Sequence, residues 1–168
     1  MKRSSRAHRH DHEWALLKIA AYVVPREDLV VAACAVAKTV LHLVTPGDSR
    51  PVRAIEIAIE WTLGRASRAG VGAAADAAWG AWIAYHHVDI VAARAARACA
   101  YAAYVAYVAL VSASAANAAN AAGAAAAVAE DVGSNREDVD RDLANIVRAS
   151  LAHRDILADL VNANRDAR

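Results

Sequence analysis

The uncharged segment from Ala98 to Ala129 limits the folds open to this chain more than any other feature. It is mostly alanine, the residue with the highest helix propensity. The segment is long enough to cross a bilayer, but alanine adds little transfer free energy, and Asn117 and Asn120 oppose insertion. We therefore expect helices that are buried in a soluble protein, with small side chains that let neighbouring helix backbones approach closely.

The composition supports the same class of fold. The 168 residues are enough for one domain with its own core. Phenylalanine is absent, so the four tryptophans and five tyrosines must supply the aromatic bulk. Apart from a short ambiguous stretch near Tyr22–Val24, no segment shows the alternation of a strand. The sequence predicts an all-α protein, a compact bundle of about six to seven helices with an alanine-rich core.

Turn and capping residues divide the chain into helices. We predict a flexible basic arm over residues 1–10 and a single helical domain over residues 11–168. Gly64 has the position of a residue that ends a helix, whereas Gly70 and Gly72 indicate a loop, or a weak point, before the next helix. The predicted helices cover, approximately, residues 12–23, 26–43, 50–63, 72–87, 89–111, 113–131 and 135–164.

Charge and cysteine content argue against several classes of function. The 19 Lys and Arg residues nearly balance the 18 Asp and Glu residues, and a net charge of +1 argues against a nucleic-acid partner. Cys34 and Cys99 do not form a CxxC pair, so we predict buried thiols in a reducing compartment. The basic N-terminus is not followed by the apolar segment of a signal peptide. These features predict a cytoplasmic protein that contacts neither nucleic acid nor membrane.

The stretch from Thr45 to Gly64, TPGDSRPVRAIEIAIEWTLG, is the most specific part of the sequence. It opens with a Pro-Gly turn. Asp48 or Ser49 can cap the helix that follows, and Pro51 suits its first turn because the N–H at that position has no partner within a helix. The sequence predicts a turn, an amphipathic helix and a glycine stop here.

Charged residues on this helix form a first candidate site. Arg53, Glu56 and Glu60 are three and four positions apart and therefore lie on one helix face. Two carboxylates on one face suit acid–base chemistry or a cation site. The ordinary alternative is an exposed ion pair that stabilises the helix slightly. We also hypothesise that Arg50 and Glu56 anchor the preceding turn to neighbouring helices.

Aromatic residues form two further stripes. The first contains Trp79, Trp82, Tyr85 and His86, and the second contains Tyr101, Tyr104 and Tyr107. Members of one stripe are mostly three or four positions apart, so they share a helix face. Such stripes can line a pocket, although they more often belong to the core, where buried hydroxyl groups need partners. If the two helices face each other, we expect a hydrogen-bond network that joins tyrosine to histidine or glutamate.

The sequence contains no local signature of catalysis or metal binding. It lacks GxSxG, P-loop, GxGxxG and HExxH motifs. His8, His10 and His12 alternate in the basic arm, where they could bind a metal weakly, but a solvated arm accounts for them as well. We therefore predict no catalytic residue, no bound metal and no cofactor.

The run from Pro46 to Glu56, followed by Trp61 and Gly64, resembles the signature of immunity proteins associated with bacterial polymorphic toxins. These are small alanine-rich helical proteins with the pattern Asp-x-Arg-Pro-Arg-x-Ala-Ile-Glu, followed by a tryptophan and a glycine. The likeness covers roughly residues 30–130. The residues that match in place are Asp48, Arg50, Pro51, Ala54, Ile55 and Glu56. The resemblance implies a small intracellular protein that neutralises a toxin by covering it.

The chain departs from this family pattern at three points. Val52 stands where the second arginine is expected, and Arg53 follows one place later, on another side of the helix. Gly47 gives Pro-Gly-Asp where the family has Pro-Asp-Asp. Tyr101 and Tyr107 stand where the family usually has two histidines. Any role of those histidines is therefore altered in this chain.

Three functions follow from these observations. The main prediction is a non-enzymatic binding protein of immunity or inhibitor type, with a toxin or another effector protein as partner. The first alternative is a helical small-ligand-binding protein or enzyme that uses the Arg53, Glu56 and Glu60 face. The second is an oligomeric scaffold assembled through the small-residue helix near residues 113–129. The candidate binding residues are Asp48, Arg50, Arg53, Glu56, Glu60, Trp61, Trp82, His86, Tyr101 and Tyr107.

Overall fold

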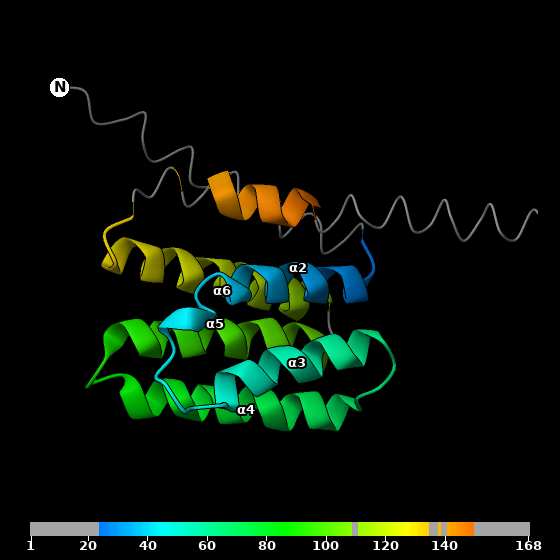
Figure 1. The fold of residues 1–168 in the computed structure, drawn as a ribbon. Coiled ribbons are helices and arrows are strands. Elements are labelled where there is room, and N and C mark those ends of the chain that lie inside the picture. Colours follow the sequence, from blue (N-terminus) through cyan, green and yellow to red (C-terminus); the bar gives the residue numbers. More distant parts are fainter. Residues whose placement is uncertain (1–23, 109–110, 135–137, 139–140, 150–168) are drawn as a thin grey trace, which may run out of the picture.

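The computed structural model describes residues 24–108, 111–134, 138 and 141–149. Its elements are α2 (Arg26–Lys38), the 3₁₀ helix η1 (Leu41–Leu43), α3 (Arg50–Thr62), α4 (Arg68–Tyr85), α5 (Ile90–Tyr107) and α6 (Val111–Asp131). Residues 141–149, which belong to the predicted last helix, are also helical. This part of the chain contains no strand. The prediction of an all-α bundle is confirmed (Figure 1).

Helix α5 lies at the centre of the bundle. Figure 1 shows α2 and α6 on one side of it and α3 and α4 on the other, and α5 packs against all four. Its buried alanines point in every direction around the helix: Ala92, Ala93, Ala95, Ala96, Ala98, Ala100, Ala102, Ala103 and Ala106. Because these side chains are small, neighbouring helices can approach α5 from several sides. None of the described helices combines the length and apolar character that crossing a bilayer requires.

A few larger side chains fill the space between the helices. The largest fully buried ones include Leu29, Val30, Val36, Ile55, Val71, Val105 and Val128. Cys34 in α2 and Cys99 in α5 are buried and unpaired, as predicted. Burial raises the pKa of both thiols to about 12. Both are therefore neutral near pH 7 and act as small apolar side chains.

The helix predicted for residues 26–43 ends earlier, at Lys38. The hydroxyl of Thr39 donates to the carbonyl of Val36 at 2.7 Å, and the Thr39 N–H donates to the same carbonyl at 3.1 Å. Bonding to a residue three positions back tightens the last turn and stops α-helical propagation. The 3₁₀ helix η1 then forms a separate turn, and residues 45–49, with the Pro-Gly turn, lead from it into α3.

Helix α4 begins at Arg68 rather than near residue 72, so the predicted loop is wrong. The side chain of Ser67 caps the helix by accepting a hydrogen bond from the Gly70 N–H at 3.1 Å. Gly70 and Gly72 therefore lie inside the first turns of α4. Gly72 serves packing, because a Cβ atom there would lie 2.7 Å from the ring of Tyr107 in α5.

Gly64 ends α3, as the sequence predicts. Gly64 and Gly133 have φ angles of +70° and +84°, the left-handed conformation that commonly ends a helix. Helix α5 ends at Tyr107, short of the predicted residue 111, because the next residue is extended. The predicted arm and first helix, residues 1–23, lie outside the described residues.

Candidate functional site

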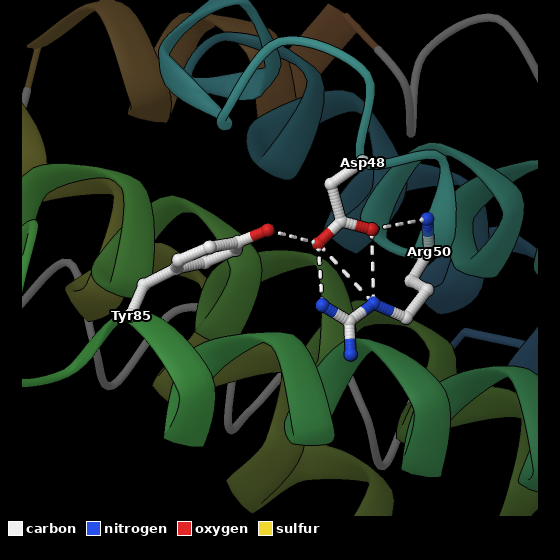
Figure 2. Close-up of polar contacts among 3 residues, drawn as sticks. All are labelled: Asp48, Arg50 and Tyr85. Atoms are coloured by element: carbon white, nitrogen blue, oxygen red, sulfur yellow. Dashed lines mark hydrogen bonds and ion pairs between the residues drawn. The ribbon is translucent and has the colours of Figure 1, made fainter.

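A corner formed by Asp48, Arg50 and Tyr85 joins the start of α3 to the end of α4 (Figure 2). The Asp48 carboxylate accepts hydrogen bonds from Arg50 Nε (2.9 Å to Oδ1) and Nη2 (2.7 Å to Oδ2). It also accepts one from the Arg50 backbone N–H at 3.0 Å. The hydroxyl of Tyr85 donates to Oδ2 at 2.7 Å. One carboxylate therefore ties the start of α3 to the far end of the next helix, through a residue 37 positions along the sequence.

These contacts stabilise the charged form of Asp48. Its side chain is 8% exposed, whereas that of Arg50 is 42% exposed. The hydrogen bonds from Arg50, aided by the one from Tyr85, hold the pKa of Asp48 well below its ordinary value of 3.8 although burial opposes this shift. The same pairing raises the pKa of Arg50. Because the chain's own donors already occupy the carboxylate, the corner fits a structural role better than a recognition site.

The charged face of α3 lies open to solvent. Arg53 Nη1 is 3.1 Å from Glu56 Oε2 and 3.8 Å from Glu60 Oε1. The side chains of Arg53 and Glu56 are more than half exposed, and such pairs stabilise a protein by only about 0.2–1 kcal/mol. Glu56 pairs along its own helix, so the hypothesis that it anchors the turn to neighbouring helices is wrong. Trp61, on the same helix, is half-buried against the core and acts in packing.

The two aromatic stripes meet between α4 and α5 and form what we call the aromatic surface. It consists of Trp79, Trp82, His86, Tyr101, Tyr104 and Tyr107. Trp79 lies 4.6 Å from Trp82 on its own helix and 5.5 Å from Tyr101 on α5, measured between ring centroids. Further ring contacts continue along both helices. The expectation that spacing places these rings together is met, except that Tyr85 turns away to the corner.

The aromatic surface is part core and part exterior. Trp79, Tyr101 and Tyr104 pack by one side against the buried core. His86 and Tyr107 are exposed, and the remaining four side chains are half-buried. A group of adjacent large rings that stays partly open to solvent is more typical of an interaction site than of a closed core.

The tyrosines of α5 have polar partners from α4. Tyr104 donates its hydroxyl hydrogen bond to Asp76 Oδ1 at 2.5 Å. Burial foremost, together with this bond, raises the pKa of Tyr104. Arg68 Nε donates a hydrogen bond to the backbone carbonyl of Tyr107. The guanidinium carbon of Arg68 lies 5.9 Å from the centroid of the Tyr107 ring. The expectation of a network that joins tyrosine to histidine or glutamate is therefore wrong, because the partners in the described part of the chain are an aspartate and arginines.

Arg97, which is not among the predicted binding residues, projects from α5 into the aromatic surface. Its guanidinium carbon lies 5.6 Å from the ring centroid of Trp82 and 5.3 Å from that of Tyr101. Its Nη2 donates to the Tyr101 hydroxyl at 3.2 Å. Its Nε is buried with no hydrogen-bond acceptor in the described part of the chain. The available signal was the spacing of four positions between Arg97 and Tyr101.

The energetic balance at Arg97 is unusual. Cation–π contacts contribute about 0.5–2 kcal/mol. A buried donor without an acceptor costs about 1–3 kcal/mol. Arg94, one turn earlier on α5, has a carboxylate partner, since its Nη1 lies 2.5 Å from Asp131 Oδ2 on α6. Arg97 is thus ordered by rings while its charge has no carboxylate partner among the described residues.

A cavity of about 540 Å³ lies elsewhere, between α2, η1, the end of α6 and the helical residues 141–149. Apolar side chains such as Val40 and Leu143 line it, together with His42 and Asp142. None of the predicted binding residues contributes to this lining. The described residues contain no cluster of metal ligands.

Comparison with known proteins found no relative of this chain. No protein-family model, curated protein or solved structure matched the chain. The resemblance of the stretch around Asp48–Glu56 to toxin-associated immunity proteins therefore stays a prediction.

Proposed function

We propose that this chain is a non-enzymatic protein-binding domain of inhibitor type, and that it binds its partner through the aromatic surface. The observation that carries this proposal is the half-buried cluster of tryptophan, tyrosine and arginine between α4 and α5. Residues of these three types dominate the binding free energy of protein interfaces. Their large, rigid rings give contact area at a low cost in conformational entropy.

Apolar side chains near the α4–α5 turn support the same surface. Ile83 lies one turn beyond Trp79 on α4, and its side chain is 58% exposed. Val88, in the turn itself, is 85% exposed. Exposed apolar residues beside partly open rings are typical of an interface centre with a polar rim. We therefore expect the partner to present apolar groups to this end of the surface.

The resemblance described above supports a toxin as the class of partner. An inhibitor of this type would occlude the toxin by forming a stoichiometric complex and would need no turnover. Tyr101 and Tyr107, which replace the family's usual histidines, both belong to the aromatic surface. The positions at which this chain differs from the family would then help to set its choice of partner.

Site-specific cross-linking tests the proposal. A photo-cross-linking amino acid replaces Ile83 in one variant and the exposed Arg53 on α3 in a matched control. We expect position 83, but not position 53, to capture one bacterial protein, and we expect W82A to abolish that capture. The captured protein must also lose its activity when mixed with an equimolar amount of the purified chain. Equal capture from both positions, or full activity in the complex, would refute the proposed function.

One observation favours the small-ligand alternative, namely the cavity of about 540 Å³. Its volume lies within the range of ligand pockets, roughly 300–1,000 Å³. If the chain binds a small molecule, the residues that line this cavity would hold it, and not the exposed Arg53 face. A thermal-shift screen of metabolites separates the two functions, because a true ligand of the cavity should stabilise wild type but lose its effect when L43W, at a half-buried lining position, narrows the space.

A further inference from the structure

We propose that Arg97 is the anchor that receives the carboxylate of an aspartate or glutamate side chain on the protein partner. This inference rests on the function proposed above and supplies the chemistry of its central contact. A partner that binds the aromatic surface would therefore place one acidic side chain against the N–H edge of the Arg97 guanidinium.

Arg97 is held in place by the chain itself. Its guanidinium carbon lies within 5.6 Å of the Trp82 ring centroid and 5.3 Å of the Tyr101 ring centroid. The hydrogen bond from Nη2 to the Tyr101 hydroxyl fixes the plane of the group further. A guanidinium already ordered by two rings loses little conformational freedom when it binds a ligand.

The charge of Arg97 has no carboxylate partner within the described residues. Four other arginines have one: Arg50 with Asp48, Arg53 with Glu56, Arg94 with Asp131 and Arg141 with Asp138. Arg97 is half-buried, and a single hydrogen bond, to Tyr101, uses one of its five N–H groups in this part of the chain. Buried charges in proteins are ordinarily paired. An acidic group from outside would complete this site.

The surrounding charges suit one carboxylate rather than a polyanion. Asp76 on α4 is engaged by the hydroxyl of Tyr104, and Arg94 is held by Asp131 on α6. A nucleic acid would require several basic groups that contact successive phosphates. The other guanidinium against these rings, that of Arg68, binds Tyr107 at the opposite end of α4 from Trp82, so the two do not form such a row. The planar fork of a guanidinium instead matches a single planar carboxylate. The geometry therefore favours an acidic side chain of a protein.

Binding measurements on Arg97 variants test this inference. The partner captured at position 83 is purified, and its affinity is measured for wild type, R97K, R97Q and the control R53Q. R97K keeps the charge but loses the fork, so we expect both Arg97 variants to bind about tenfold or more weakly. R53Q should stay within about twofold of wild type. Neutralising one particular acid of the partner should weaken binding to wild type and have no further effect on R97Q.

The outcomes distinguish this inference from the proposed function. Equal affinities of wild type and R97Q, with capture at position 83 intact, would overturn the anchor role alone. If position 83 captures no specific partner in the otherwise wild-type chain, the proposed function itself is wrong. If R97Q splits a wild-type dimer into monomers, the acid belongs to a second copy and the inference is wrong.

A second measurement needs no Arg97 variant, so it tests the inference even if those variants fail to fold. In wild type, the ¹⁵N resonance of the Arg97 side chain is followed during titration with sodium acetate and, separately, with sodium chloride. We expect acetate to shift this resonance at concentrations at which chloride does not. Identical responses to the two salts would show that the site does not select a carboxylate.

Discussion

Replacing Arg50 by alanine should destabilise the fold by about 2 kcal/mol through the loss of a single ion pair. In wild type, Asp48 accepts bonds from the Arg50 guanidinium at 2.7 and 2.9 Å, from the Arg50 N–H at 3.0 Å and from the Tyr85 hydroxyl at 2.7 Å. R50A removes the guanidinium and leaves the other two donors. The carboxylate, whose side chain is 8% exposed, then keeps its charge with fewer partners.

The magnitude follows from the exposure of the two partners. Breaking a fully buried ion pair costs about 3–5 kcal/mol, and a hydrogen bond to a charged group contributes about 1.5–3 kcal/mol. Arg50 is 42% exposed, so water can partly replace its guanidinium, and the lower range applies. For a chain of 168 residues, a loss of about 2 kcal/mol lowers Tm by about 4–8 °C.

The pH dependence of this loss has a definite sign. The pKa of Asp48 is lowered in the folded state, so the unfolded chain binds a proton first as the pH falls. The stabilisation by the corner is therefore complete well above the ordinary pKa of 3.8 and is lost progressively below it. The pKa of Asp48 is lowered less in R50A, so the stability difference between the two proteins should shrink below that pH.

Urea unfolding followed by far-UV circular dichroism, at about pH 7 and about pH 3, measures both effects. R53A is the matched control, because it removes an exposed pair on the same helix and should cost no more than about 1 kcal/mol. The reasoning fails if R50A unfolds at the same urea concentration as wild type, or if its deficit is unchanged at the lower pH. If R50A keeps full stability but loses partner binding, the corner is a recognition site instead.

Three further predictions concern packing, a single hydrogen bond and thiol reactivity. G72A should cost a net 0–2 kcal/mol, roughly, in urea unfolding, because the clash of its methyl group with the Tyr107 ring outweighs a gain of about 1 kcal/mol in helix propensity; in a Y107A background, the same change should become stabilising. Y85F should cost about 1 kcal/mol, since it removes one hydroxyl donor from the corner carboxylate and leaves the arginine in place; an unchanged Tm would contradict this. Cys34 and Cys99 should react with a thiol reagent at pH 8 only as fast as the protein opens, and both should react at once in urea. Rapid labelling of the native protein would show that α2 and α5 separate readily.

Local chemistry allowed the stretch from Thr45 to Gly64 to be predicted well. The proline near the start of α3 and the glycine after its end act on their immediate neighbours, and the structure has both features. Helix α4 shows the limit of such reasoning. Two glycines in its first turns cost about 1 kcal/mol each relative to alanine, which predicts a loop. The serine cap and close packing against Tyr107 outweigh that preference, and the packing depends on a residue far along the chain.

Long-range contacts explain what the sequence could not show about the candidate sites. Asp48 and Arg50 are two positions apart, so an interaction between them was accessible, but Tyr85 reaches this carboxylate only once α3 and α4 pack. The aromatic stripes followed from spacing alone. Their partial exposure did not, because α5 carries alanine on nearly all sides and offers no apolar contrast that would indicate which face lies inside.

The corner and the aromatic surface are physically linked because both depend on α4. Tyr85 fixes the end of this helix to the turn before α3, while Trp79 and Trp82 lie in its last two turns. A binding surface made of half-buried rings keeps its shape only if the helices beneath it are rigid. A weaker corner would therefore lower partner affinity without any contact to the partner. Stability and affinity must be compared on the same variants, and a residue of the aromatic surface such as Arg97 should change affinity out of proportion to stability.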